Sequence, residues 1–89
     1  MINAFLVNEF GERIRELRIE KNLSQEALSF ITGFHRTYIG MIERGERNIS
    51  LTNMAVFAKV FEMSISELLD FSSINPKHNY KNYETKSEE

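Results

Sequence analysis

The most restrictive feature of the chain is the segment SQEALSFITGFHRTYIGMIERGERN, residues 24–48, which favours two short helices joined by a tight turn. Ser24 is a side-chain cap and predicts a helix that begins at Gln25. Gly33 stands where the chain must turn, because glycine adopts a left-handed backbone at little cost. Apolar residues then fall where the two helices would pack together, namely Leu28, Phe34, Ile39 and Ile42. The segment predicts a packed helix pair over about 25–32 and 36–44, a helix-turn-helix unit.

Periodicity and capping residues predict three further helices around this pair. One covers about residues 8–21, with a start at residue 8 or earlier. Ser50 caps a helix over about 51–61, and Ser64 with Glu67 forms a capping box before a short helix over about 65–71. Because no segment alternates in the manner of a strand, the fold class is all-α with five helices. The first helix carries an apolar stripe at spacings of four and three: Leu6, Phe10, Ile14 and Leu17.

The composition changes after Phe71. Residues 72–89 are polar and contain the only proline, Pro76, which favours a mobile tail with Tyr80 and Tyr83 as its possible docking groups. The sequence therefore predicts one small domain over 1–71, with the helix-turn-helix unit at about 25–44, and a tail over 72–89.

Composition argues against several classes of protein. The chain has no cysteine, and its two histidines, His35 and His78, have no acidic neighbours at ligand spacing. We therefore expect no metal, no cofactor and no enzymatic activity. No apolar run reaches the length of a membrane span, and the first residues lack a basic region, so we expect a cytoplasmic protein.

Charge is weighed by its position along the chain. The net charge of −2 disfavours a broad, non-specific DNA-binding surface. From Gly11 to Asn48, however, the sequence contains seven lysines and arginines and six glutamates, and several of the arginines lie in or just after the second helix of the pair. This balance permits a small and specific DNA contact.

The second helix of the pair divides into two faces when it is unrolled at 100° per residue. Its core face is predicted to hold His35, Ile39 and Ile42, and its outward face Thr37, Gly40 and Arg44, flanked by Arg36 and Met41. A major groove admits one α-helix, and arginine can donate two hydrogen bonds to a guanine edge. Tyr38 lies at the margin, where its hydroxyl suits a phosphate. Each of these side chains could instead be merely solvated, and Arg44 is also favoured by the helix dipole.

The segments LSQEALS, HRTYI and IERGERNISL resemble the Xre-type helix-turn-helix family of phage Cro and repressor proteins. Within that family, HRTYIGMIERGERNISL is most similar to the controller proteins of restriction–modification systems, over about Phe10 to Leu69. The resemblance implies a five-helix homodimer that binds a double-stranded DNA operator. It also implies regulation of transcription of its own gene and an endonuclease gene, with RNA polymerase as a further candidate partner.

The resemblance also implies roles for individual residues. Arg36, Thr37 and Arg47 match base-reading positions, whereas Gln25, Tyr38 and Asn48 match backbone contacts, to which the outward face adds Arg44. Arg18 and Glu43 match an internal ion pair.

The predicted helix over 51–61 is apolar nearly all round, so a second subunit is expected to cover part of it. The alternative is that the rest of the same chain covers it. The expected dimer interface contains Phe57, Val60, Ile65, Leu68 and Phe71.

Two other interpretations stay open. The first is a prophage repressor or an antitoxin-type protein that also binds a protein partner through the tail and Phe30, which should point outward. The second, a protein-interaction module without a DNA role, is disfavoured by the arginine-bearing face.

Overall fold

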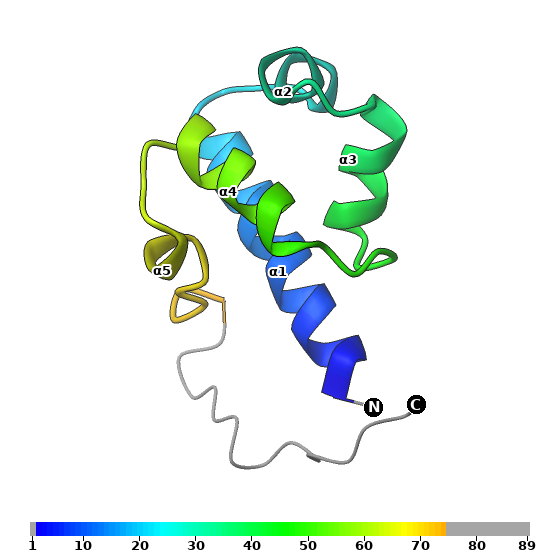
Figure 1. Cartoon of the computed structure of the whole chain (residues 1–89), viewed down its shortest axis with the longest axis vertical. Helices are drawn as coiled ribbons and strands as arrows, with labels where there is room; N and C mark the ends of the chain where they lie inside the picture. The colour runs from blue at the N-terminus through cyan, green and yellow to red at the C-terminus, as the bar shows by residue number, and fades with distance from the viewer. Residues whose placement is uncertain (1, 75–89) are drawn as a thin grey trace.

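The computed structural model describes residues 2–74 as five helices, shown in Figure 1. They are α1 (Ile2–Glu20), α2 (Gln25–Thr32), α3 (Arg36–Glu43), α4 (Leu51–Val60) and α5 (Ile65–Leu68). The all-α prediction is confirmed over the described residues. Each helix in this part of the chain is too short or too polar to cross a bilayer.

Three serines begin helices as the sequence predicts. The hydroxyl oxygens of Ser24, Ser50 and Ser64 accept hydrogen bonds from backbone N–H groups in the first turns of α2, α4 and α5. At α5 the Glu67 carboxylate accepts the backbone N–H of Ser64, which completes the capping box. Gly33 ends α2 with a φ of +80°. The predicted bounds of α2 are therefore confirmed.

One of the two outer helices differs from its predicted bounds. α5 ends at Leu68 instead of continuing to about residue 71, whereas α1 begins at Ile2, which agrees with the predicted start at residue 8 or earlier. The chain after α5 returns to α1, where the Ser73 hydroxyl donates to Glu16 Oε1 at 2.9 Å. Ser73 thus contacts α1, and the tail over 72–89 stays a prediction. Pro76, Tyr80 and Tyr83 lie outside the described residues.

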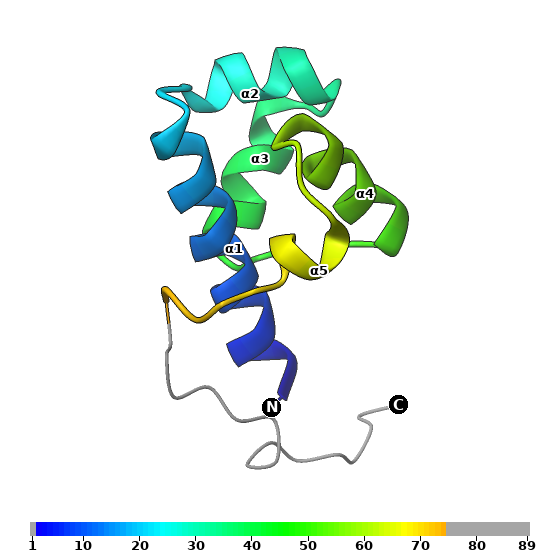
Figure 2. The same ribbon diagram turned by 90° about the vertical axis from the view of Figure 1, so that its left-hand side faces the viewer.

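The helices pack around α1, which runs the length of the domain in Figures 1 and 2. α2 lies across the C-terminal end of α1, and α5 lies beside its middle, where Arg13 donates to the carbonyl oxygens of Glu67 and Leu68. The core between them contains Phe10, Ile14, Leu17, Leu28, Ile39, Ile42, Phe57, Ala58, Phe61, Leu68 and Phe71.

α1 and α3 touch backbone to backbone at Gly11. A Cβ atom built on this buried glycine would overlap the carbonyl oxygen of Ile42 and would lie 2.8 Å from that of Glu43. Only glycine lets the two helices approach so closely. The end of α3 is thereby fixed to the longest helix of the domain.

The expected dimer interface needs correction. Phe57 and Leu68 are fully buried and Phe71 is 4% exposed, all within the core of the single chain. Within α4, Phe57 faces inward while Leu51 is 65% exposed. Val60 and Ile65 are half-buried against the core.

Candidate nucleic-acid interface

The start of α3 is exposed, as a reading helix requires. Arg36 and Thr37 occupy its first two positions and are both exposed. His35 was predicted to face the core, but it is the exposed N-cap residue of α3. Its backbone is extended, with φ −64° and ψ 142°. The rotation of 100° per residue that assigned the faces of the helix therefore does not apply to His35.

Gly40 was predicted to lie on the outward face, but it is buried. A Cβ at Gly40 would lie 3.1 Å from Arg44 Nη1 and 3.6 Å from Gln25 Oε1. The side chain of Arg44 therefore folds back along α3 over the glycine. Gly40 makes room for the protein's own arginine, and the outward face is built by Arg36, Thr37, Arg44 and the half-buried Met41.

Arg44 is held by an acidic partner that the sequence analysis missed. Its Nε and Nη2 donate to the two carboxylate oxygens of Glu46 at 2.9 and 3.1 Å. These hydrogen bonds, together with the opposite charges, raise the pKa of Arg44 and lower the pKa of Glu46. Both side chains are about half exposed, so water and salt screen the pair.

Tyr38 on α3 contacts both the loop that follows this helix and α4. Its ring lies 5.5 Å below the guanidinium carbon of Arg47, and its hydroxyl oxygen accepts a hydrogen bond from Asn53 Nδ2 at 3.0 Å. Arg47 and Asn48 are exposed in that loop. Sequence reasoning did not single out Asn53, because nothing in its local pattern distinguishes it from a solvated residue in the first turn of a helix.

Gln25 meets a buried ion pair at the junction of α1, α2 and α3. Arg18 Nε and Nη2 donate to the Glu43 carboxylate at 2.6 and 3.0 Å, and Arg18 Nη1 donates to the Leu23 carbonyl oxygen at 2.8 Å. Gln25 Nε2 donates to the same carboxylate at 3.2 Å. The Glu43 side chain is 4% exposed and that of Arg18 is 13% exposed. The start of α2 is thus joined to the end of α3.

Ion pairing separates the arginines into two groups. Arg13, Arg18 and Arg44 are each paired with a glutamate. Over residues 2–74, Arg15, Arg36 and Arg47 have no such partner within salt-bridge distance; Arg36 begins α3 and Arg47 lies in the loop after it. Positive charge without internal neutralisation therefore lies at the start of α3 and in the loop after it. In the same part of the chain, no three acidic or histidine side chains gather as metal ligands.

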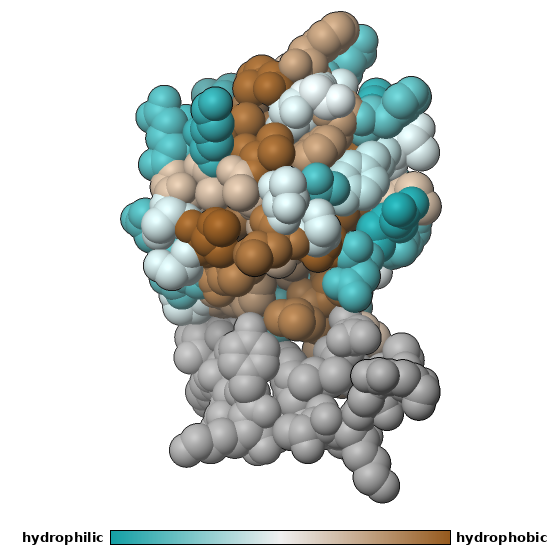
Figure 3. All heavy atoms as spheres, viewed as in Figure 1, coloured by the Kyte–Doolittle hydropathy of each residue, from teal (hydrophilic) through white to brown (hydrophobic). Residues whose placement is uncertain are grey.

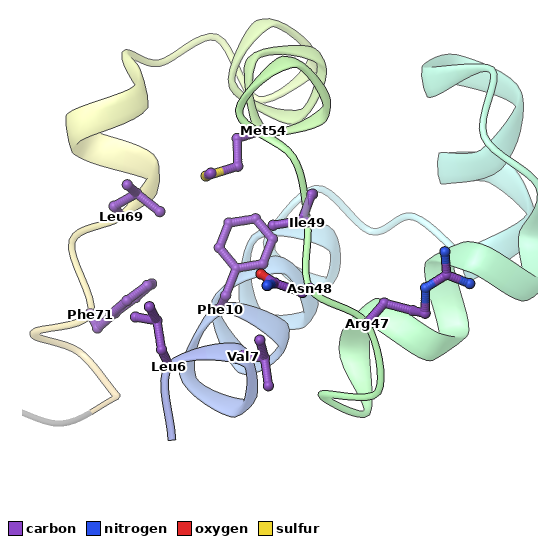
Figure 4. A pocket seen from close by; sticks show the side chains of 9 residues that line it. All are labelled: Leu6, Val7, Phe10, Arg47, Asn48, Ile49, Met54, Leu69 and Phe71. Atoms are coloured by element: carbon purple, nitrogen blue, oxygen red, sulfur yellow. The ribbon is translucent and has the colours of Figure 1, made fainter. Parts of the chain in front are cut away.

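A small apolar cavity of about 120 Å³ lies behind the loop that carries Arg47 and Asn48. Figure 4 shows its walls, which come from α1, the start of α4 and the region of α5. Arg47 extends away from the cavity, on the side of the loop that faces α3. The lining residues are Leu6, Val7, Phe10, Arg47, Asn48, Ile49, Met54, Leu69 and Phe71.

Comparison with known proteins identifies the class to which this fold and surface belong. The model of the helix-turn-helix family matches residues 14–68, so the chain belongs to this family of DNA-binding proteins. The control protein C.BamHI of Bacillus amyloliquefaciens is 47% identical over 66 residues, which cover 73% of this chain and 82% of the relative.

Solved structures agree with this relationship. The restriction–modification controller protein C.AhdI of Aeromonas hydrophila is 47% identical, with a TM-score of 0.66 over 70% of this chain and 94% of its own. The controller C.Esp1396I, as a tetramer in complex with its natural 35-base-pair operator, is 33% identical, with a TM-score of 0.67 over 74% of this chain and 91% of its own. The protein is a helix-turn-helix regulator of the controller type, which confirms the resemblance inferred from its motifs.

Proposed function

We propose that this protein is a sequence-specific transcriptional regulator that binds an inverted-repeat operator as a homodimer. We infer that it controls a restriction–modification operon that includes its own gene. The observation that carries the DNA-binding surface is the position of two exposed arginines that have no acidic partner within salt-bridge distance over residues 2–74, Arg36 in the first turn of α3 and Arg47 in the loop after it.

Arg36 and Thr37 are assigned to base edges, because they occupy the exposed first turn of α3. Arg47 is assigned to a base from the adjacent loop. Backbone contact is assigned to Gln25, Tyr38 and Asn48, and these groups would set the register of α3 in the groove. Arg44 can reach a phosphate by exchanging the Glu46 carboxylate for it, which makes its contribution smaller than that of a free arginine.

An apolar surface on α4 and α5 supports the homodimer. Leu51 at the start of α4 is 65% exposed and Leu69, the residue that follows α5, is 37% exposed, and the half-buried Met54, Val60 and Ile65 belong to these two helices. Figure 3 shows hydrophobic residues gathered over the part of the molecule where Figure 1 places α4 and α5. A second copy would remove this surface from water, and two-fold symmetry would match an inverted repeat.

The DNA-binding assignment is tested by comparing Arg36→Ala with Gln25→Ala on the operator and on scrambled DNA. Arg36→Ala should cost about 1–3 kcal/mol on the operator and relax preference at one base position in each half-site. Gln25→Ala should weaken binding to both DNAs alike.

Arg15→Ala is the matched control, since it removes an exposed arginine of α1 that also lacks an ion-pair partner among residues 2–74. It should change operator binding far less than Arg36→Ala. Equal losses for Arg36→Ala on operator and scrambled DNA would reassign this arginine to the DNA backbone.

The dimer is tested by sedimentation of Leu69→Glu beside Ile19→Glu. Ile19 is 53% exposed on α1, so the control places the same charge on an exposed apolar residue outside the proposed surface. Leu69→Glu should yield a monomer, whereas Ile19→Glu should remain a dimer. A parent chain that sediments as a monomer at tens of micromolar, an order-of-magnitude choice for weak association, would refute the homodimer.

Control of transcription is tested with a reporter behind the operator selected from random DNA. The protein should change reporter output only when that operator is intact. RNA polymerase is a further candidate partner, which we infer from the controller relationship alone. A reporter unaffected by the protein would contradict the regulatory role.

A further inference from the structure

We propose that Asn53 is a positioning residue for DNA binding, because its amide fixes the direction in which Tyr38 donates its hydroxyl hydrogen. The inference rests on the proposed function, in which Tyr38 contacts the DNA backbone. Asn53 lies on α4, outside the helix-turn-helix pair, and reaches the pair through one side-chain hydrogen bond.

The hydrogen bond sets the polarity of the hydroxyl. Asn53 Nδ2 donates to Tyr38 Oη at 3.0 Å, so the tyrosine oxygen acts here as an acceptor. A phenol also carries one donor hydrogen, which must then point away from the amide. Within residues 2–74 no hydrogen bond uses that hydrogen. A donor that points away from the amide is available to a phosphate oxygen, since phosphate oxygens accept hydrogen bonds.

Both partners of this hydrogen bond are held in place. The backbone N–H of Asn53 donates to the Ser50 hydroxyl at 3.1 Å, which fixes the first turn of α4. The Tyr38 ring packs edge-on against Phe34 with 5.2 Å between centroids, and Phe34 lies 5.3 Å from the fully buried ring of Phe57. The hydroxyl is therefore positioned from the core and does not have to be ordered on binding, which lowers the entropic cost of the DNA contact.

The same ring also supports Arg47. The guanidinium carbon of Arg47 lies 5.5 Å from the ring centroid, within the range of a cation–π contact. A ring held by Asn53 and Phe34 therefore gives the loop arginine a fixed surface to stack on. Through Tyr38, one amide on α4 orders two of the side chains assigned to DNA.

The test replaces the donor at position 53 and measures operator affinity. Asn53→Asp keeps the shape but offers only acceptors, so the Tyr38 hydrogen turns toward residue 53 and is lost to the phosphate. This variant should weaken operator binding by about tenfold or more. Asn53→Leu removes the donor without adding charge and should weaken binding by about threefold.

Two controls separate orientation from other effects. In the Tyr38→Phe background there is no hydroxyl to orient, so Asn53→Leu should leave affinity unchanged within about twofold, and Asn53→Asp should show only its charge effect. Thr52→Asp adds the same charge at the neighbouring exposed residue and should cost less than Asn53→Asp. Unfolding midpoints are measured for every variant, and Asn53→Ala replaces Asn53→Leu if leucine lowers the midpoint.

The inference is overturned if Asn53→Leu weakens binding equally with and without the Tyr38 hydroxyl, or not at all. Its failure can be told apart from failure of the proposed function. A parent protein that selects an operator and loses it on Arg36→Ala, while all Asn53 variants bind normally, refutes only the role of Asn53. A parent protein that selects no operator refutes both.

Discussion

The junction of α1, α2 and α3 offers a sharp test of how charge is tolerated inside this small domain. Arg18 and Glu43 form a nearly buried ion pair, with side chains 13% and 4% exposed. We compare Arg18→Met and Glu43→Leu as single variants with the double variant that carries both. Each single change leaves one charge in the interior without its partner, whereas the double change leaves two apolar side chains of similar volume.

The expected magnitudes follow from what each stranded group retains. Removal of one partner of a buried pair typically costs about 3–5 kcal/mol, a large part of the roughly 5–15 kcal/mol by which a domain is stable. In Arg18→Met the Gln25 amide at 3.2 Å is the one side-chain partner that the Glu43 carboxylate keeps among residues 2–74. In Glu43→Leu the arginine keeps the Leu23 carbonyl at 2.8 Å and is more exposed than Glu43. Arg18→Met should therefore be the more damaging single change.

The assay is urea unfolding of the parent, both single variants and the double variant, with the free energies of unfolding combined in a double-mutant cycle. The double variant should recover most of the loss, since replacement of a buried ion pair by apolar residues is often neutral. Glu46→Ala, which breaks the exposed pair with Arg44, is the control and should leave the unfolding midpoint unchanged. If the two single losses simply add in the double variant, the pair is not coupled and the reasoning fails.

Three further outcomes are expected. Gly11→Ala should lower the free energy of unfolding by a few kcal/mol, of the order seen for overpacked interiors, because its Cβ would meet the backbone at the end of α3; an unchanged urea midpoint would contradict this. The hydrogen bond from the backbone N–H of Ser64 lowers the pKa of Glu67 below its ordinary value of 4.5. The stabilisation from this ionised cap is therefore fully present above pH 4.5 and disappears as the pH falls through the lowered pKa. Glu67→Gln keeps the capping geometry without the titration, so its unfolding midpoint should vary less with pH below 4.5 than that of the parent. Deletion of residues 75–89 should leave unfolding cooperativity and operator affinity unchanged, and a loss of either would show that these residues belong to the domain.

Helix bounds that depend on a few neighbouring residues could be predicted from the sequence. The bounds of α2 follow from Ser24 and Gly33, and the start of α5 follows from its capping box, since each depends on a few neighbouring residues. α1 was expected near residue 8 or earlier, and its true start lies in the apolar residues that precede the recognised stripe. For these elements, side-chain caps and glycine conformations decide the structure.

Features that depend on tertiary packing were harder to predict. The burial of Phe57 could not be deduced, because a helix that is apolar on every side does not indicate which side faces the core. Gly40 was misplaced because helical angles alone do not show that the Arg44 side chain folds back over it. The pairing of Arg44 with Glu46 and of Asn53 with Tyr38 likewise depends on side-chain geometry. The family resemblance correctly implied the Arg18–Glu43 pair, which a charge count cannot locate.

The contact at Gly11 has a mechanical consequence for the proposed complex. Because the end of α3 rests directly on the backbone of α1, we expect α3 and α1 to move together. Two such domains related by a dimer axis would present their α3 helices at a fixed separation and angle. An operator whose half-sites do not match that geometry would have to bend or twist to fit, and the deformation energy of the DNA would reduce its affinity. The flexibility of the base steps between the half-sites would thus contribute to the choice of operator.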